Sequence, residues 1–160
     1  MRIALAATLV VACGRAPDRA AIGHSTETVG VHRTASVSAA SCPATGQWTE
    51  CAVFQRLDRA GLAPRRDSGG ATEPPLTVPG LLLRVNTSEL ELYIYADTKS
   101  REREEATLER SKYVDYATPL AMQPLPTLIR SANLIAILHS RNDHQRERVA
   151  DALIAGPPQP

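Results

Sequence analysis

The chain has 160 residues, of which 43 % are hydrophobic and only 4 % aromatic. This length suits one domain with accessory segments, and the hydrophobic content suffices for a core built mainly from aliphatic side chains. The formal net charge is +1 and no long run of one sign occurs, which argues against nucleic acid as a partner and against an electrostatically bound membrane surface.

The first segment combines one charged residue, Arg2, with an apolar run from Ile3 to Ala12. As a helix this run would span about 15 Å, half of a ~30 Å hydrocarbon core, so a stable membrane-spanning helix is not expected. Its length is typical of the apolar region of a secretory signal peptide. The alternative is the first turns of a buried helix.

The end of this run carries a family signature. Val10-Val11-Ala12-Cys13 resembles the lipobox of bacterial lipoproteins, in which small or branched apolar residues precede a cysteine. The resemblance implies lipid on the Cys13 thiol, cleavage between Ala12 and Cys13, and acyl chains such as palmitate at the new N-terminus. In a Gram-negative organism, Gly14 in place of aspartate favours the periplasmic side of the outer membrane. Ordinary secretion with a chance cysteine is the alternative.

Three parts of the chain follow from this interpretation. Residues 1–12 are the predicted signal peptide, 13–46 the lipidated N-terminus and a flexible tether, and 47–160 a small domain. The tether is rich in Gly, Ser, Thr and Ala and lacks any helical or strand period. Its histidines, His24 and His32, are too sparse to indicate a metal-binding tail.

The cysteines support export. Lipidation of Cys13 removes the odd thiol and leaves Cys42 and Cys51, which an oxidising compartment would allow to form a disulfide. The alternatives are two free thiols or a buried Cys51. A metal site or a redox-active pair is disfavoured because neither residue lies in a CxxC motif.

The folded part is predicted to begin with a helix near Gln47, which Thr45 caps and Gly61 ends. Residues 64–79 are rich in Pro and Gly and predict a mobile loop.

Residues 80–97 then predict a β-hairpin that turns at residues 86–88. In its second strand, Leu90, Leu92, Ile94 and Ala96 alternate with Glu89, Glu91, Tyr93 and Tyr95. Such alternation indicates one buried and one polar face.

Residues 98–110 predict a very polar helix capped by Asp97 or Thr98. Its carboxylates interleave with arginines and are predicted to form a solvated face rather than a general acid or base. They are Glu102, Glu104, Glu105 and Glu109.

Residues 111–126 predict an irregular connector with three prolines. Residues 127–140 predict two short strands around 131–133, or one bulged strand. The continuously apolar run 134–138 is predicted to be central and covered on both faces. A helix capped by Asn142 closes the chain.

This order of elements indicates an α+β domain with a small antiparallel sheet of three to four strands and helices on one face. The sequence contains no nucleophile elbow, HExxH, P-loop or GxGxxG motif, so no cofactor is expected. His139, Asp143 and His144 flank one turn, but they are predicted to be solvent-facing side chains rather than metal ligands.

The tyrosines give the candidate binding surface. Tyr93, Tyr95, Tyr113 and Tyr116 are predicted to form an amphipathic patch for an envelope protein or a glycan. The alternative is that they pack under a helix or at the edge of the sheet.

The sequence therefore predicts a lipid-anchored, extracytoplasmic protein with a binding or envelope-structural domain and no catalytic activity. The alternatives are a small cell-envelope hydrolase with an unrecognised site, and a subunit that docks through an exposed strand edge.

Overall fold

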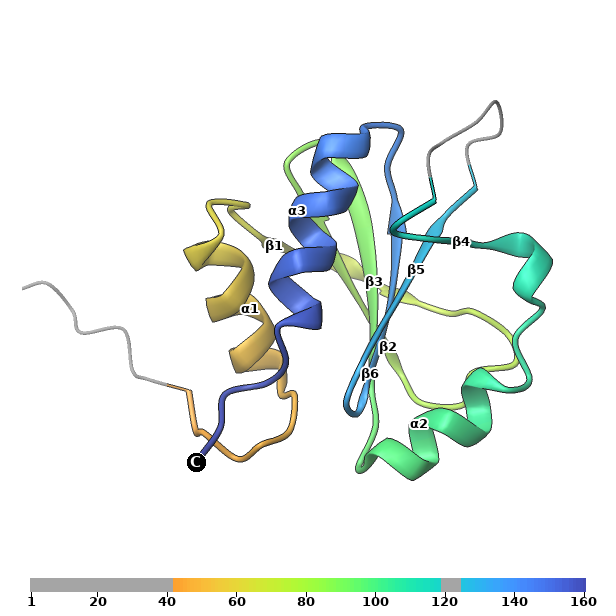
Figure 1. Ribbon diagram of the computed structural model, residues 1–160, viewed down its shortest axis with the longest axis horizontal. Coiled ribbons are helices and arrows are strands. Elements are labelled where there is room, and N and C mark those ends of the chain that lie inside the picture. Colours follow the sequence, from red (N-terminus) through yellow and green to blue (C-terminus); the bar gives the residue numbers. More distant parts are fainter. Residues whose placement is uncertain (1–41, 119–124) are drawn as a thin grey trace, which may run out of the picture. The chain divides into compact units, whose positions relative to one another are not determined.

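The structure is a computed structural model that describes residues 42–118 and 125–160. The predicted signal peptide, Cys13 and most of the predicted tether lie outside these residues. In chain order, the elements of the described part are α1 Glu50–Arg59, β1 Arg65–Ala71, β2 Gly80–Val85, β3 Ser88–Ile94, α2 Thr98–Glu105, the short 3-10 helix η1 Arg110–Lys112, β4 Val114–Asp115, β5 Thr127–Ser131, β6 Leu134–His139 and α3 Asp143–Ile154 (Figure 1).

The strands of this part form one sheet in the order β1-β2-β3-β6-β5-β4. Neighbouring strands are antiparallel, except that β4 runs parallel to β5. The α+β class is confirmed, but the sheet has six strands rather than three or four and is mixed. The prediction of a central strand at 134–138 is also confirmed, since β6 lies between β3 and β5 and is buried at every position before His139.

The two strands that the sequence did not predict are held by backbone pairing. β1 lies within the predicted loop 64–79 and pairs with β2 at both of its ends, with a register shift between Arg66 and Gly70. Most of its side chains are exposed, so it carries no apolar alternation. β4 lies within the predicted connector, where the Val114 N–H donates to Pro126 O over 3.0 Å.

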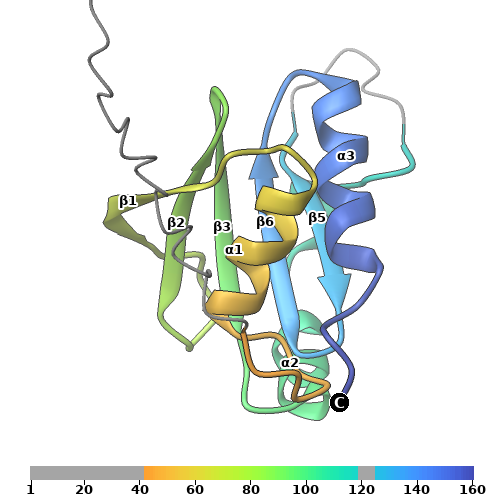
Figure 2. The ribbon, with the colours of Figure 1, turned by 90° about the vertical axis from the view of Figure 1, so that its left-hand side faces the viewer.

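One face of the sheet is covered by α1 and α3, which Figure 2 shows in front of the strands. Val53 and Leu57 of α1 and Val149 and Leu153 of α3 are fully buried there. We call this cluster the first-face core. Its other buried members are Trp48, Ala52, Leu62, Leu83, Val85, Leu90, Leu92, Ile129, Leu134, Ala136, Leu138, Ala150 and Ala152.

The opposite face is also covered, so the prediction of helices on one face is wrong. α2 packs there against β6, and the segment 72–79 passes over the same side of the sheet (Figures 1 and 2). We call residues 72–79 and 98–112 together the cover. The cluster beneath it, the second-face core, contains Leu76, Tyr93, Tyr95, Leu108, Leu128, Ile135 and Ile137.

Capping side chains and one glycine mark where the helices begin and end. The Asp97 and Asn142 side chains accept hydrogen bonds from the first turns of α2 and α3, as predicted. α1 is capped by Thr49 rather than Thr45, because the Thr49 hydroxyl accepts from the Ala52 N–H over 3.2 Å. Gly61 follows the end of α1 with a φ of 68°, a left-handed conformation that favours glycine.

The folded unit begins before Gln47, so the predicted tether extended too far. Cys42 and Cys51 are joined by a disulfide with their Cα atoms 5.6 Å apart, and Cys42 packs against the first-face core. The Gly46 N–H donates to Pro158 O over 2.9 Å, which ties this segment to the end of the chain. Residues 42–46 are therefore part of the domain.

Trp48 lies inside this disulfide loop and is held by the turn between β5 and β6. Its backbone N–H donates to Asn133 Oδ1 over 2.7 Å, and its indole N–H donates to Ser131 Oγ over 3.1 Å. The Asn133 amide group donates in turn to the backbone oxygens of Trp48 (3.1 Å) and Tyr95 (2.7 Å). One buried amide therefore joins the N-terminal segment, the turn and the end of β3.

Candidate functional site

The predicted tyrosine patch is not a surface patch. Tyr93 is fully buried and Tyr95 is 4 % exposed, because the cover lies over the second face of β3. Tyr113 packs partly buried against the same core, and Tyr116 is 42 % exposed. The prediction of a shared surface is therefore wrong for Tyr93 and Tyr95, and β3 is an internal strand rather than an edge that could accept a partner strand.

The three covered tyrosines instead donate to carboxylates. Their hydroxyl groups join Tyr93 to Glu91 (2.7 Å), Tyr95 to Glu104 (3.0 Å) and Tyr113 to Glu73 (2.8 Å). Burial raises the pKa of each phenol, and the adjacent carboxylate raises it further. The phenols therefore remain protonated donors, and each closes a polar contact at the margin of the second-face core.

Glu91 and His139 form the candidate functional site. They lie on neighbouring strands, β3 and β6, with His139 Nε2 2.8 Å from Glu91 Oε1. The imidazole is 40 % exposed and the carboxylate side chain 16 % exposed. The other Glu91 oxygen accepts the Tyr93 hydroxyl. The carboxylate thus orients an imidazole that solvent reaches, an arrangement able to hold or exchange a proton.

The two pKa values of this pair move in opposite directions. The hydrogen bond to Glu91 raises the pKa of His139 despite the opposing effect of burial. Burial alone would raise the pKa of Glu91, but the hydrogen bonds from His139 and Tyr93 outweigh it and lower the value. The pair is therefore most stable with both groups charged.

We expect this pair to give the protein a pH-dependent stability. The His139 contribution is complete below its ordinary pKa of 6.5 and is lost as the pH rises through the raised folded value. The Glu91 contribution is present above its ordinary pKa of 4.5 and is lost as the pH falls through the lowered value. Between pH 6 and pH 9, the unfolding free energy of the wild type should fall relative to that of His139→Gln, by about 0.2–1 kcal/mol for a partly exposed pair. Urea unfolding at both pH values measures the difference.

His144→Gln is the matched control, because the His144 side chain is 79 % exposed on the first turn of α3. It should keep the pH dependence of the wild type. A His139→Gln profile parallel to that of the wild type would contradict a role for the pair in stability.

His139, Asp143 and His144, which flank the turn after β6, have separate partners. His139 bonds Glu91, Asp143 accepts from Arg146 over 2.7 Å, and His144 lies 3.9 Å from Glu147. Within residues 42–118 and 125–160, no group of three or more His, Cys, Asp or Glu side chains is placed to hold a metal ion.

The carboxylates of α2 are only partly a solvated face. Glu102 and Glu109 are exposed, as predicted. Glu105 is 7 % exposed and accepts from Arg101, from Arg130 (3.0 Å) and from Arg110 (3.2 Å). α2 ends at Glu105 rather than at residue 110, and the side of the helix that carries Glu105 faces β5 and β6. The prediction is therefore wrong for Glu105, whose buried charge is matched by guanidinium groups.

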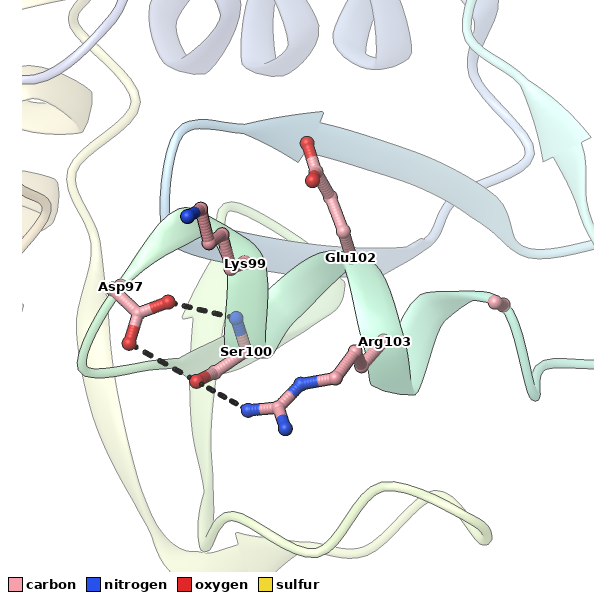
Figure 3. A pocket seen from close by; sticks show the side chains of 6 residues that line it. Asp97, Lys99, Ser100, Glu102 and Arg103 are labelled. Carbon is pink, nitrogen blue, oxygen red and sulfur yellow. Dashed lines mark hydrogen bonds between the residues drawn. The ribbon is translucent and has the colours of Figure 1, made fainter.

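Open depressions lie elsewhere on the surface of the described residues. One, of about 770 Å³, is lined by Asp97, Lys99, Ser100, Glu102, Arg103 and Ala106. Figure 3 shows that Asp97, Ser100 and Arg103 already bond one another there, so these groups cap α2. Another, of about 420 Å³, lies beside the exposed Tyr116 and the acidic side of α3.

Comparison with protein-family models, with curated proteins and with solved structures finds no match to this chain. Evidence on its function therefore comes from its own residues. Among the described residues, no helix is long and apolar enough to cross a membrane.

Proposed function

We propose that this chain is an exported, lipid-anchored protein of the bacterial cell envelope. The observation that carries the proposal is the disulfide between Cys42 and Cys51. Structural disulfides persist in oxidising compartments outside the cytoplasm. The bond accounts for two of the three cysteines and leaves Cys13, the cysteine of the lipobox-like sequence, which lies outside the described residues.

Lipid on Cys13 would supply the membrane attachment. Each buried methylene group contributes roughly 0.8 kcal/mol, so several acyl chains together hold a protein firmly on one leaflet. The segment that follows Cys13 would then act as a tether, which raises the effective concentration of the domain near other envelope components. The expected partner is an envelope protein or a glycan.

We assign the domain a binding or structural role rather than a catalytic one. Support comes from the way the fold uses its titratable groups. Glu104 accepts from Thr77 and Tyr95, and Glu105 accepts from three arginines, of which Arg130 lies on β5. These side chains hold separate elements together, which is a structural use of groups that a hydrolase would direct at a substrate.

Cys13→Ser tests the anchor. We expect the wild type in the membrane fraction with incorporated palmitate label, and the variant in the soluble fraction without label. Cell fractionation and metabolic labelling measure both properties.

Cys51→Ser is the control for this experiment, because it removes the disulfide and leaves Cys13 in place. It should stay in the membrane fraction. Membrane retention of Cys13→Ser, or a wild type that never takes up lipid label, would refute the proposal.

A further inference from the structure

Different chemical groups make the polar contacts on the two faces of the sheet. On the first face, the buried polar contacts are made by amides, hydroxyls and one guanidinium, which also pairs with the exposed carboxylate of Asp143 over 2.7 Å. Asn133 binds Trp48, Gln145 donates to Val85 O over 2.7 Å, and Arg146 donates to the Thr127 hydroxyl over 2.6 Å. Amides, aliphatic hydroxyls and guanidinium groups do not change charge between pH 3 and pH 7.

On the second face, carboxylates hold the cover. Glu104 of α2 accepts from both the backbone N–H of Thr77 (2.9 Å) and the Thr77 hydroxyl. This contact fixes the segment 72–79 next to Leu76, which is 8 % exposed in the second-face core. Glu73 in the same segment accepts from Tyr113. The segment is therefore attached to α2 through Glu104 and to Tyr113 through Glu73.

Glu104 and Glu105 also connect the cover to Tyr95 and to Arg130 of the sheet, while Glu91 at the margin bonds Tyr93 and His139. Hydrogen bonds to a charged carboxylate are roughly twice as strong as those between neutral groups. Glu104 faces Thr77, Tyr95 and Arg103, and Glu73 faces Tyr113. Glu91 faces Tyr93 and His139, and Glu105 faces Arg101, Arg110 and Arg130. Two further carboxylates lie near these partners, Glu89 near His139 and Glu109 near Tyr113. Donors and cations thus predominate around these glutamates.

These neighbours determine whether acid raises or lowers the stability of the second face. Burial opposes the charged form of Glu91, Glu104 and Glu105, but hydrogen bonds outweigh it and lower the pKa of all three. A lowered folded value means that the contribution to stability is present above the ordinary pKa of 4.5 and is lost as the pH falls through the folded value. Acid therefore weakens the second face, whereas the amide and hydroxyl contacts of the first face do not titrate.

We propose that residues 72–79 are an acid-released part of the cover: when Glu104 is protonated, this segment detaches from the second face and exposes the apolar surface beneath it, while the first-face core stays packed. This release does not depend on membrane attachment. It would leave part of the second face accessible to solvent or to another molecule.

The aromatic residues provide a separate optical reporter for each face. Trp48 is the only tryptophan of the chain and lies in the first-face core. Tyr93, Tyr95 and Tyr113 all lie at the second-face core. In an acid titration of the full chain from pH 7 to pH 3, we expect the near-ultraviolet circular dichroism of tyrosine to change at higher pH than the fluorescence of Trp48. Coincident transitions, or a change at Trp48 first, would overturn the proposal.

Glu104→Gln tests the attachment at neutral pH. The glutamine keeps the size of the side chain but removes its charge, and we expect hydrogen exchange at the Thr77 amide to become about tenfold faster. Glu147→Gln is the matched control and should leave this rate unchanged, because the Glu147 side chain is 70 % exposed and belongs to α3, which packs on the first face of the sheet. An unchanged Thr77 rate in a folded Glu104→Gln protein would overturn the proposal. If that variant does not fold, the wild-type titration alone decides.

Discussion

Replacing Asn133 with alanine is expected to lower the free energy of unfolding by about 3–4 kcal/mol. The change removes the acceptor of the Trp48 N–H and the donor to the backbone oxygens of Trp48 and Tyr95. All three backbone groups lie in buried contacts, so they would lose a partner without gaining water. Chemical unfolding followed by the fluorescence of Trp48 measures the loss.

Thr87→Ala is the matched control for this experiment. Thr87 is the second residue of the two-residue turn between β2 and β3, as Asn133 is of the turn between β5 and β6. Thr87 is exposed, so its replacement should change the unfolding free energy by no more than about 0.5 kcal/mol. A similar small effect for Asn133→Ala would show that the amide does not hold the N-terminal segment.

Loss of the disulfide is expected to cost about 2.5 kcal/mol. The bond closes a loop with a sequence separation of nine residues, and chain entropy predicts this amount for a loop of that size. The measurement compares the unfolding free energies of Cys13→Ser and of the triple variant that also carries Cys42→Ser and Cys51→Ser. The Cys13→Ser background ensures that a reductant acts only on this pair.

A reductant provides the internal control. It should lower the stability of the Cys13→Ser protein to that of the triple variant and leave the triple variant unchanged. Equal stabilities before reduction would contradict a stabilising bond.

The elements that were predicted correctly are those whose signals lie within their own residues or directly beside them. The apolar alternation of β3 and the apolar run of β6 gave the centre of the sheet, and Asp97 and Asn142 marked two helix starts. β1 gave no such signal because most of its side chains are exposed and its place depends on backbone pairing with β2. Local patterns therefore suffice for the strands that bury side chains and fail for an exposed edge.

The second face could not be predicted because its burial is decided by distant segments. Glu91, Tyr93 and Tyr95 alternate with apolar residues and look like a solvated face, until residues 72–79 and α2 cover the two tyrosines. The environment of Glu105 is non-local in the same way, since Arg130 lies 25 residues away in the chain. Arg146 did leave a signal, because it shares a helix face with the buried Val149 and Leu153, but its acceptor at Thr127 belongs to another element.

The disulfide also determines how the domain would carry mechanical load. A pull on the chain from its N-terminal side reaches the fold at Cys42 and passes through the covalent bond directly to Cys51 on α1. Residues 43–50 then lie in a slack loop, so Trp48 and its bonds to Asn133 and Ser131 bear no tension. The load falls instead on the packed length of α1, which must be sheared from the sheet as a unit. In the reduced protein the same pull would peel the segment around Trp48 away one contact at a time.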